Sequence, residues 1–305
     1  MLSQDKKKAP TAGFLVVPNL DDAVAYYTRV FGATEAERYQ DTRGKVWYAV
    51  IHIFDLPIQL MEPFPSMGLF APDPTTGGTA DASALVINLR NIDTPFNTAV
   101  RSGSTPIVTP QHNPIDGART SDFRDPFGHR WQIRLDTKPG IVPALVVPNL
   151  DQAVGFNVTV FKASEKQRVI HPIDKTSQST LTLGAGSMLL LEASPSRSLA
   201  PLPISTTYRD SSMLAFTVPD LDATYTAAIK AGATPIITPH DAYWGDRYAE
   251  IRLPFSPIRA AGCGVEETPI PVSPTDMQKT FDKFLVDNNN PLSPAEVIGD
   301  KMVTS

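Results

Sequence analysis

The sequence contains a single cysteine, Cys263, among its 305 residues. One cysteine excludes an intrachain disulfide and any zinc or iron–sulfur site built from cysteine ligands. Charge is also scarce, because charged residues make up 19% of the chain and the formal net charge is -5. Nucleic-acid binding requires a clustered basic surface, and this composition does not supply one. We therefore expect no nucleic-acid partner.

Long apolar runs are absent as well. No stretch approaches the roughly 18 consecutive apolar residues that a membrane span needs, so we expect no membrane association. Lys6, Lys7 and Lys8 have no apolar segment behind them, which argues against a secretory signal. The expected location is the cytoplasm.

Proline is the residue in excess, with 29 in the chain. Its distribution follows an internal repeat, in which the seven residues Leu15–Asp21 return unchanged at Leu145–Asp151. Further on, Thr105-Pro106-Ile107 returns as Thr234-Pro235-Ile236. These collinear matches indicate a tandem duplication with a period of about 130 residues. Much of the proline excess is then explained by prolines at turns and strand ends that occur once in each copy.

Each copy contains a finer repeat. In the first copy the pattern predicts a strand over 13–17, a helix from about 20 that ends at Gly32, and strands over 46–54 and 58–61. The same order restarts with a strand over 84–89, a helix over 93–101 and three strands up to residue 135. Each copy therefore reads as two βαβββ units. Units of this size cannot bury both faces alone and must pair.

The motifs that begin and end the first copy resemble a known family. They are Phe14-Leu15-Val16-Val17, Tyr26-Tyr27, Val30-Phe31-Gly32-Ala33 and Asp125-Pro126-Phe127-Gly128-His129-Arg130-Trp131. This pattern resembles the vicinal oxygen chelate superfamily, and it is most similar to the glyoxalase/bleomycin-resistance/dioxygenase proteins of the PhnB-like branch. The resemblance implies an α+β fold in which four βαβββ units pair into two cup-shaped domains with the helices outside.

The predicted organisation has four parts: a flexible N-terminus (1–10), a first cup domain (11–138), a second cup domain (139–263), and a proline-rich linker with a helical tail (264–305). In the second domain Leu253-Pro254-Phe255-Ser256-Pro257 replaces the usual turn, so we expect its last strand to be altered or shortened. The tail helix has one apolar face and either docks on the protein's own body or completes a homodimer.

The resemblance also implies a metal pocket with His, Glu or Gln ligands on the first and fourth strands of each unit. Those positions hold Ala12, Ala84, Gln59 and Gln132 in the first copy and Val142, Met213, Leu189 and Ala260 in the second. Gln59, Gln132 and the nearby His52 are weak candidates. We therefore expect no cofactor and no complete metal site, with a bound divalent metal as the alternative.

Aromatic and polar residues are the expected lining of the two cups. The candidates are Trp47, Phe54, Gln59, Met61, Phe123, Trp131 and Gln132 in the first copy and Tyr208, Tyr243, Trp244, Arg247 and Tyr248 in the second. Aromatic surface with few polar groups suits a small organic ligand. Glu62 and Glu192 are candidate acid–base residues if the cups desolvate them. Solvated strand-end carboxylates are the alternative.

The sequence thus favours a metal-free protein that binds a small aromatic or hydrophobic molecule, similar to the sequestering resistance proteins of this superfamily. The alternative is an enzyme of the superfamily, a lyase, isomerase or dioxygenase with an atypical metal site or a metal-free acid–base site. A third reading is an interaction module built on a decayed enzyme. Whether the chain is an enzyme stays open at this point.

Overall fold

The structure is a computed structural model, and it describes residues 13–40, 46–54, 56–65, 68–72, 83–114, 116–184, 186–197, 199, 210–242, 247–256 and 258–264. Within these ranges, none of the helices combines the length and apolar character that crossing a membrane requires. The predicted N-terminal segment (1–10) and the tail beyond Gly264 lie outside the described residues.

The prediction of four βαβββ units is confirmed. Unit one contains β1 (Gly13–Val16), α1 (Leu20–Phe31), β2 (Thr34–Gln40), β3 (Val46–Ile53) and β4 (Leu56–Met61). Unit two contains β5 (Ser83–Leu89), α2 (Asp93–Arg101), β6 (Thr105–His112), β7 (Arg119–Arg124) and β8 (Arg130–Leu135). Units three and four repeat the order in the second copy: β9 (Gly140–Val147), α3 (Leu150–Phe161), β10 (Ser164–Ile170), β11 (Ser177–Leu183), β12 (Gly186–Glu192), and β13 (Ser212–Val218), α4 (Leu221–Lys230), β14 (Thr234–Asp241), β15 (Arg247–Arg252), β16 (Arg259–Gly264).

Local chemistry that the duplication preserves sets the start of the first helix in each copy. Asn19 caps α1, because its side-chain oxygen accepts the N–H of Asp22 at 3.0 Å. Asn149 does the same for α3, accepting from Gln152 at 2.9 Å. Such a cap satisfies one of the backbone N–H groups that a helix leaves free at its start. The repeated Pro-Asn motif is therefore a strand-to-helix turn.

The units combine into two eight-stranded sheets. One has the order β14-β15-β16-β13-β1-β4-β3-β2 and joins units one and four; we call it sheet 1–4. The other has the order β10-β11-β12-β9-β5-β8-β7-β6 and joins units two and three; we call it sheet 2–3. The two copies meet where β1 pairs with β13 and β5 pairs with β9, both antiparallel.

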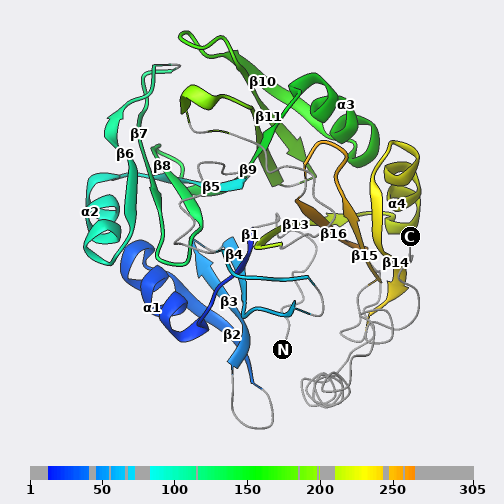
Figure 1. The fold of residues 1–305 in the computed structure, drawn as a ribbon, viewed down its shortest axis with the longest axis horizontal. Coiled ribbons are helices and arrows are strands. Elements are labelled where there is room, and N and C mark those ends of the chain that lie inside the picture. Colours follow the sequence, from blue (N-terminus) through cyan, green and yellow to red (C-terminus); the bar gives the residue numbers. More distant parts are fainter. Residues whose placement is uncertain are drawn as a thin grey trace.

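This pairing differs from the sequence-based picture, in which each cup belongs to one copy. The units of one copy share a hydrophobic core instead of a sheet. Core one spans β1 to β8 and contains the packing of α1 against α2, and core two contains that of α3 against α4. Figure 1 shows the two helix pairs at opposite edges of the molecule, with β1, β5, β9 and β13 near the middle. The edges of β1 and β5 are covered by strands of the other copy, β13 and β9, which leaves neither edge unpaired.

The last strand of the second copy is complete. β16 has 6 residues, as β8 does, and pairs with both β13 and β15. The replacement of Asp125-Pro126-Phe127-Gly128 by Leu253-Pro254-Phe255-Ser256 instead changes the hydrogen bonds of the turn before this strand. In the first copy Asp125 Oδ1 accepts the N–H groups of Phe127 and His129, both at 2.9 Å. Leu253 cannot do so, and Ser256 Oγ accepts the N–H of Ile258 at 3.3 Å in that turn.

Candidate functional site

Each sheet has one face packed on helices and a second face that we call its inner face. Side chains alternate along a strand, so the core assigns the faces. In β1, Leu15 belongs to core one, and Phe14 therefore points to the inner face of sheet 1–4. In β8, Trp131 and Ile133 belong to core one, and Gln132 points to the inner face of sheet 2–3.

The inner face of sheet 1–4 carries a hydrophobic cluster of its own. Phe14, Val16, Leu69 and Met213 are its buried members, and Tyr48, Met61, Phe64 and Ala71 pack against them while only partly buried. Phe64 and Leu69 lie on a segment that follows β4 and doubles back, because the N–H of Phe64 donates to the carbonyl of Leu69 at 2.9 Å. Aromatic, thioether and aliphatic side chains thus meet at the centre of this face.

A buried ion pair fixes the segment over the sheet. Arg252 on β15 binds Asp210 through two hydrogen bonds of 2.9 and 3.0 Å, and both side chains are less than one-tenth exposed. Asp210 also binds the covering segment, since its carbonyl accepts from Phe70 and its N–H donates to Gly68, both at 2.9 Å. Two parallel bonds between guanidinium and carboxylate fix orientation as well as distance. The pair therefore clamps the segment to sheet 1–4.

The inner face of sheet 2–3 has smaller side chains at positions equivalent to the hydrophobic cluster of sheet 1–4. Its repeat partners of Phe14 and Met61 are Ala144 and Leu191. Asp122 binds Arg130 at 2.5 Å, with both groups buried, and also accepts from Gln132 Nε2 at 3.1 Å. The two inner faces are thus chemically different although the duplication relates them.

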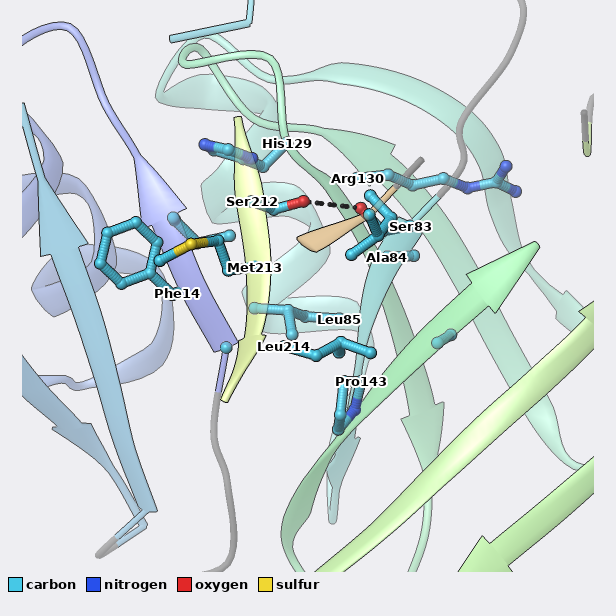
Figure 2. A pocket seen from close by; sticks show the side chains of 14 residues that line it. Phe14, Ser83, Ala84, Leu85, His129, Arg130, Pro143, Ser212, Met213 and Leu214 are labelled. Carbon is cyan, nitrogen blue, oxygen red and sulfur yellow. Dashed lines mark hydrogen bonds between the residues drawn. The ribbon is translucent and has the colours of Figure 1, made fainter. Parts of the chain in front are cut away.

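A small cavity lies between the central strands, where all four units meet. It has a volume of about 30 Å³, and its lining includes Gly13, Ser83, Pro143 and Ser212, one residue from each unit. Figure 2 shows the hydroxyls of Ser83 and Ser212 hydrogen-bonded across it, at 3.0 Å, and Phe14 close to Met213. This volume suits about one water molecule and excludes an organic ligand.

The structure brings three of the predicted lining residues onto one surface. Gln59, Met61 and Tyr248 all point to the inner face of sheet 1–4, and Gln132 points to that of sheet 2–3. Phe123 and Trp131 lie elsewhere, because both are fully buried inside core one. The predicted residues Tyr208, Tyr243 and Trp244 lie outside the described residues.

The other candidates lie at the periphery. Phe54 is 41% exposed at the β3–β4 turn and has a left-handed φ of 53°. Trp47 precedes Tyr48 on β3 and contacts its ring, with centroids 5.6 Å apart. Arg247 forms surface ion pairs with Asp222 and Asp241, which raise the pKa of its guanidinium and lower that of Asp222.

The two candidate catalytic carboxylates lie at equivalent strand ends on different sheets. Glu62 follows β4, and its N–H donates to the carbonyl of Trp47 at 3.0 Å. Glu192 ends β12, and its Oε2 accepts the N–H of Ser177 at 2.7 Å. This hydrogen bond joins the end of β12 to the start of the neighbouring strand β11. Both side chains are half-buried.

The donor set does not fit a divalent metal. Gln59 and Gln132 point to the inner faces of different sheets. Gln59 has the apolar residues Phe14 and Val50 as its ladder neighbours. His52 lies two residues after Val50 on β3 and would add one nitrogen ligand at most. Among the residues that the structure describes, no group of three His, Cys, Asp or Glu side chains is placed to hold an ion. No chemical step is therefore assigned to a metal.

Several inner-face residues escape the sequence pattern. Strand alternation assigns Phe14 and Tyr48 to the inner face once their neighbours Leu15 and Ala49 are known to be core residues. Phe64, Leu69 and Asp210 come from connecting segments with no periodicity, so no local signal assigns them to the sheet.

Comparison with known proteins identifies the family. Residues 10–133 match the model of the Glyoxalase/Bleomycin resistance protein/Dioxygenase superfamily. An uncharacterized protein of Mycobacterium bovis is 31% identical over 137 residues, which is 44% of this chain and 88% of that protein. An uncharacterized protein of Mycobacterium tuberculosis is also 31% identical over 137 residues, covering 79% of its length. The chain belongs to this glyoxalase superfamily.

Solved structures extend the likeness beyond the part that the family model matches. Glyoxalase I from Zea mays has a TM-score of 0.63 at 15% identity, covering 89% of this chain and 94% of that one. A putative dioxygenase from Bacillus subtilis has a TM-score of 0.56 at 11% identity, covering 96% and 99%. At these identities the likeness shows the fold alone. The second copy thus shares the glyoxalase-superfamily fold despite its altered turn.

Proposed function

We propose that this glyoxalase-superfamily protein binds a small aromatic or hydrophobic molecule on the inner face of sheet 1–4, without a metal. The observation that carries the proposal is the set of half-buried apolar side chains Tyr48, Met61 and Phe64 around buried Phe14 and Met213. Ligand sites are mostly apolar and aromatic with few polar groups, and methionine adapts its shape to the ligand.

The other inner face supports the choice by contrast. Ala144 and Ala84 stand where sheet 1–4 has Phe14 and Met213, so stacking surface is missing there. Its polar groups Asp122, Arg130 and Gln132 bind one another. We therefore propose one ligand per chain, sequestered in a cytoplasmic protein of the PhnB-like branch.

Methionine methyl groups offer a direct test. The chain has 7 methionines, of which Met61 and Met213 belong to the inner-face cluster and Met188 is buried in core two. With ¹³C-methyl methionine, 2-naphthol, indole and quinoline serve as probes in a titration followed by NMR. We expect the Met61 and Met213 signals to move and the Met188 signal to stay. If no probe moves Met61 or Met213 at millimolar concentration, the proposal is wrong.

A further inference from the structure

The hydrophobic cluster on the inner face of sheet 1–4 keeps Tyr48, Met61 and Phe64 only partly buried, so it still offers apolar surface. We propose that the segment 275–287, which follows β16 in the chain, docks on this cluster as an amphipathic helix and competes there with the ligand. The competition rests on the proposed function, whereas the docking itself does not. The segment is then an occupant of the face that the ligand displaces.

The sequence of this segment supplies an apolar stripe, although its residues lie outside the described part of the chain. Its apolar side chains share one face of a helix with 3.6 residues per turn: Met277, Phe281, Phe284 and Leu285. Asp282 and Lys283 fall away from that face. A helix of this length is marginal in water by itself, and it is stabilised when its stripe packs against an apolar surface.

β16 brings the chain onto the same face just before the tail begins. Thr217 on β13 and Cys263 on β16 are ladder partners near the ends of the two parallel strands. Phe216 and Ala260 belong to core two, so alternation along the strands points Thr217 and Cys263 to the inner face. The tail therefore starts next to a residue of the face that we propose it covers.

Small side chains line the way from that point to the cluster. Ala215 and Ala261 are the next inner-face pair in the same ladder, and Met213 follows on β13. Met213 in turn lies opposite Phe14 on β1, within the cluster. Side chains as short as alanine rise little above the backbone, so they do not obstruct a segment that runs along these strands.

The distance to the cluster is within reach of the connecting residues 265–274. Along the strands, the row of Met213 lies about 17 Å from Gly264, at about 3.3 Å per residue. Phe14 lies two strands across from β16, which adds about 10 Å sideways. A linker of this length spans up to roughly 33 Å when extended. A helix that begins at residue 275 can therefore lie over Phe14 and Met213.

The tether makes this segment a stronger competitor than a free peptide. A short linker holds the stripe near the cluster at an effective concentration of about a millimolar. A helix that binds the cluster with a dissociation constant of about 0.1 mM would then cover it in roughly nine molecules out of ten. The N-terminal segment 1–12, which precedes β1, carries Lys6, Lys7 and Lys8 and has no such stripe. Between these two terminal segments, the stripe therefore favours 275–287.

Substitutions in the full chain test the competition. Phe281→Ser with Phe284→Ser removes the centre of the stripe, and we call this double change the stripe variant. Asp282→Ser with Lys283→Ser is the matched control, because it keeps the stripe and the net charge. In titration calorimetry the stripe variant should bind 2-naphthol about tenfold more tightly than wild type, since the open fraction rises from roughly one in ten to nearly all. The control should bind as wild type does.

Methionine methyl signals test the docking itself. In the stripe variant without ligand, the Met61 and Met213 signals should move relative to wild type, and the Met188 signal should stay. In wild type, adding 2-naphthol should move the signal of Met277, which lies in the stripe, and leave that of Met302 beyond it. This second readout uses the unaltered chain, so it decides the matter even where the stripe variant does not fold.

The outcomes separate this inference from the proposed function. Equal affinity of wild type and stripe variant for 2-naphthol, or a Met277 signal that stays while Met61 and Met213 move, overturns the docking and leaves the proposed function standing. A doubled mass in light scattering that the stripe variant loses would assign the segment to a second copy, and it would overturn the docking as well. If 2-naphthol moves neither Met61 nor Met213 in the stripe variant, where the face is open, the proposed function itself fails.

Discussion

Core one and core two are related by the duplication, yet they bury different chemistry. Core one contains a polar network centred on the carboxylate of Asp125, and core two has none of its members. The network residues of the first copy are Tyr27, Asp125, His129 and Trp131, and their repeat partners are Asn157, Leu253, Ile258 and Ala260.

Asp125 explains why these positions change together. Its Oδ2 accepts from the Tyr27 hydroxyl at 2.7 Å and from Trp131 Nε1 at 2.9 Å, and its Oδ1 accepts the two N–H groups of the turn. Burial raises the pKa of Tyr27 well above its usual range, so the hydroxyl remains a donor. Losing the carboxylate alone would leave each donor buried without an acceptor. A satisfied network is therefore replaced as a unit or not at all.

Core two fills the same space with other residues and less completely. Ala260 and Gly262 stand where core one has Trp131 and Ile133, and a cavity of about 20 Å³ remains beside them. Phe161 and Phe216 occupy part of the space, with ring centroids 4.8 Å apart. Core one is thus held by specific polar geometry, and core two by apolar contacts that tolerate gaps.

The largest expected effect breaks the network of core one. Asp125→Ala should lower the free energy of unfolding by about 3–5 kcal/mol, because the Tyr27 hydroxyl and the Trp131 N–H lose their acceptor. In a Tyr27→Phe background the same change should cost about 1–2 kcal/mol less. Urea unfolding of the four proteins measures this coupling. Additive effects within about 0.5 kcal/mol would show that the network does not act as a unit.

The clamp on sheet 1–4 should rank next. Asp210→Ala leaves Arg252 buried without its carboxylate, and we expect a loss of about 3 kcal/mol in the free energy of unfolding. Asp116→Ala is the matched control on the other sheet, since its partner Arg134 is 30% exposed, and it should cost less than about 1 kcal/mol. Similar losses in the two variants would contradict the clamp.

A pH-dependent difference separates His129 from its repeat partner Ile258. Burial lowers the pKa of His129, whose Nε2 donates to the carbonyl of Val16 at 2.9 Å. Below the unfolded-state pKa of about 6.5 the unfolded chain binds a proton that the folded chain does not, so stability falls as the pH falls. The slope from this residue is at most about 1.4 kcal/mol per pH unit.

His129→Ile should remove that contribution between pH 7 and 5, whatever its effect on stability at pH 7. Urea unfolding of both proteins across this range gives the two slopes. An unchanged slope in the variant would mean that His129 is protonated as readily in the folded chain as in the unfolded one.

The smallest effect concerns the cavity in core two. A Cβ added at Gly262 would come within 2.7 Å of Leu221 Cδ1, the flexible end of a side chain that also lines the cavity. Gly262→Ala should therefore change the free energy of unfolding by less than about 1 kcal/mol, in the stabilising direction. Ile133→Ala in core one should cost about 2–4 kcal/mol. A larger loss from Gly262→Ala than from Ile133→Ala would contradict the picture of a looser core two.

Much of the fold could be predicted from the sequence, because the duplication and the Pro-Asn turns act locally. The pairing of β1 with β13 could not be predicted. The first strands of all four units are short apolar runs, and such a run does not indicate which strand it pairs with. Phe123 and Trp131 illustrate a second gap. They alternate with Asp122 and Gln132, and composition alone does not tell which side of a strand meets the helices.

The candidate site was harder to predict, because it joins units that are distant in sequence. Gln59, Met61 and Tyr248 were within reach as polar or apolar strand residues. Phe64, Leu69 and Asp210 were not, since a covering segment has no periodicity to read.

The central claim is that one inner face binds an aromatic ligand and its duplicate does not. Titration calorimetry with 2-naphthol on wild type, Met61→Ala and Leu191→Ala tests it most directly, because Met61 and Leu191 are repeat partners on the two faces. We predict one site per chain, binding about 5- to 20-fold weaker in Met61→Ala, and unchanged binding in Leu191→Ala. Two equal sites, or a loss in Leu191→Ala with none in Met61→Ala, would contradict the account.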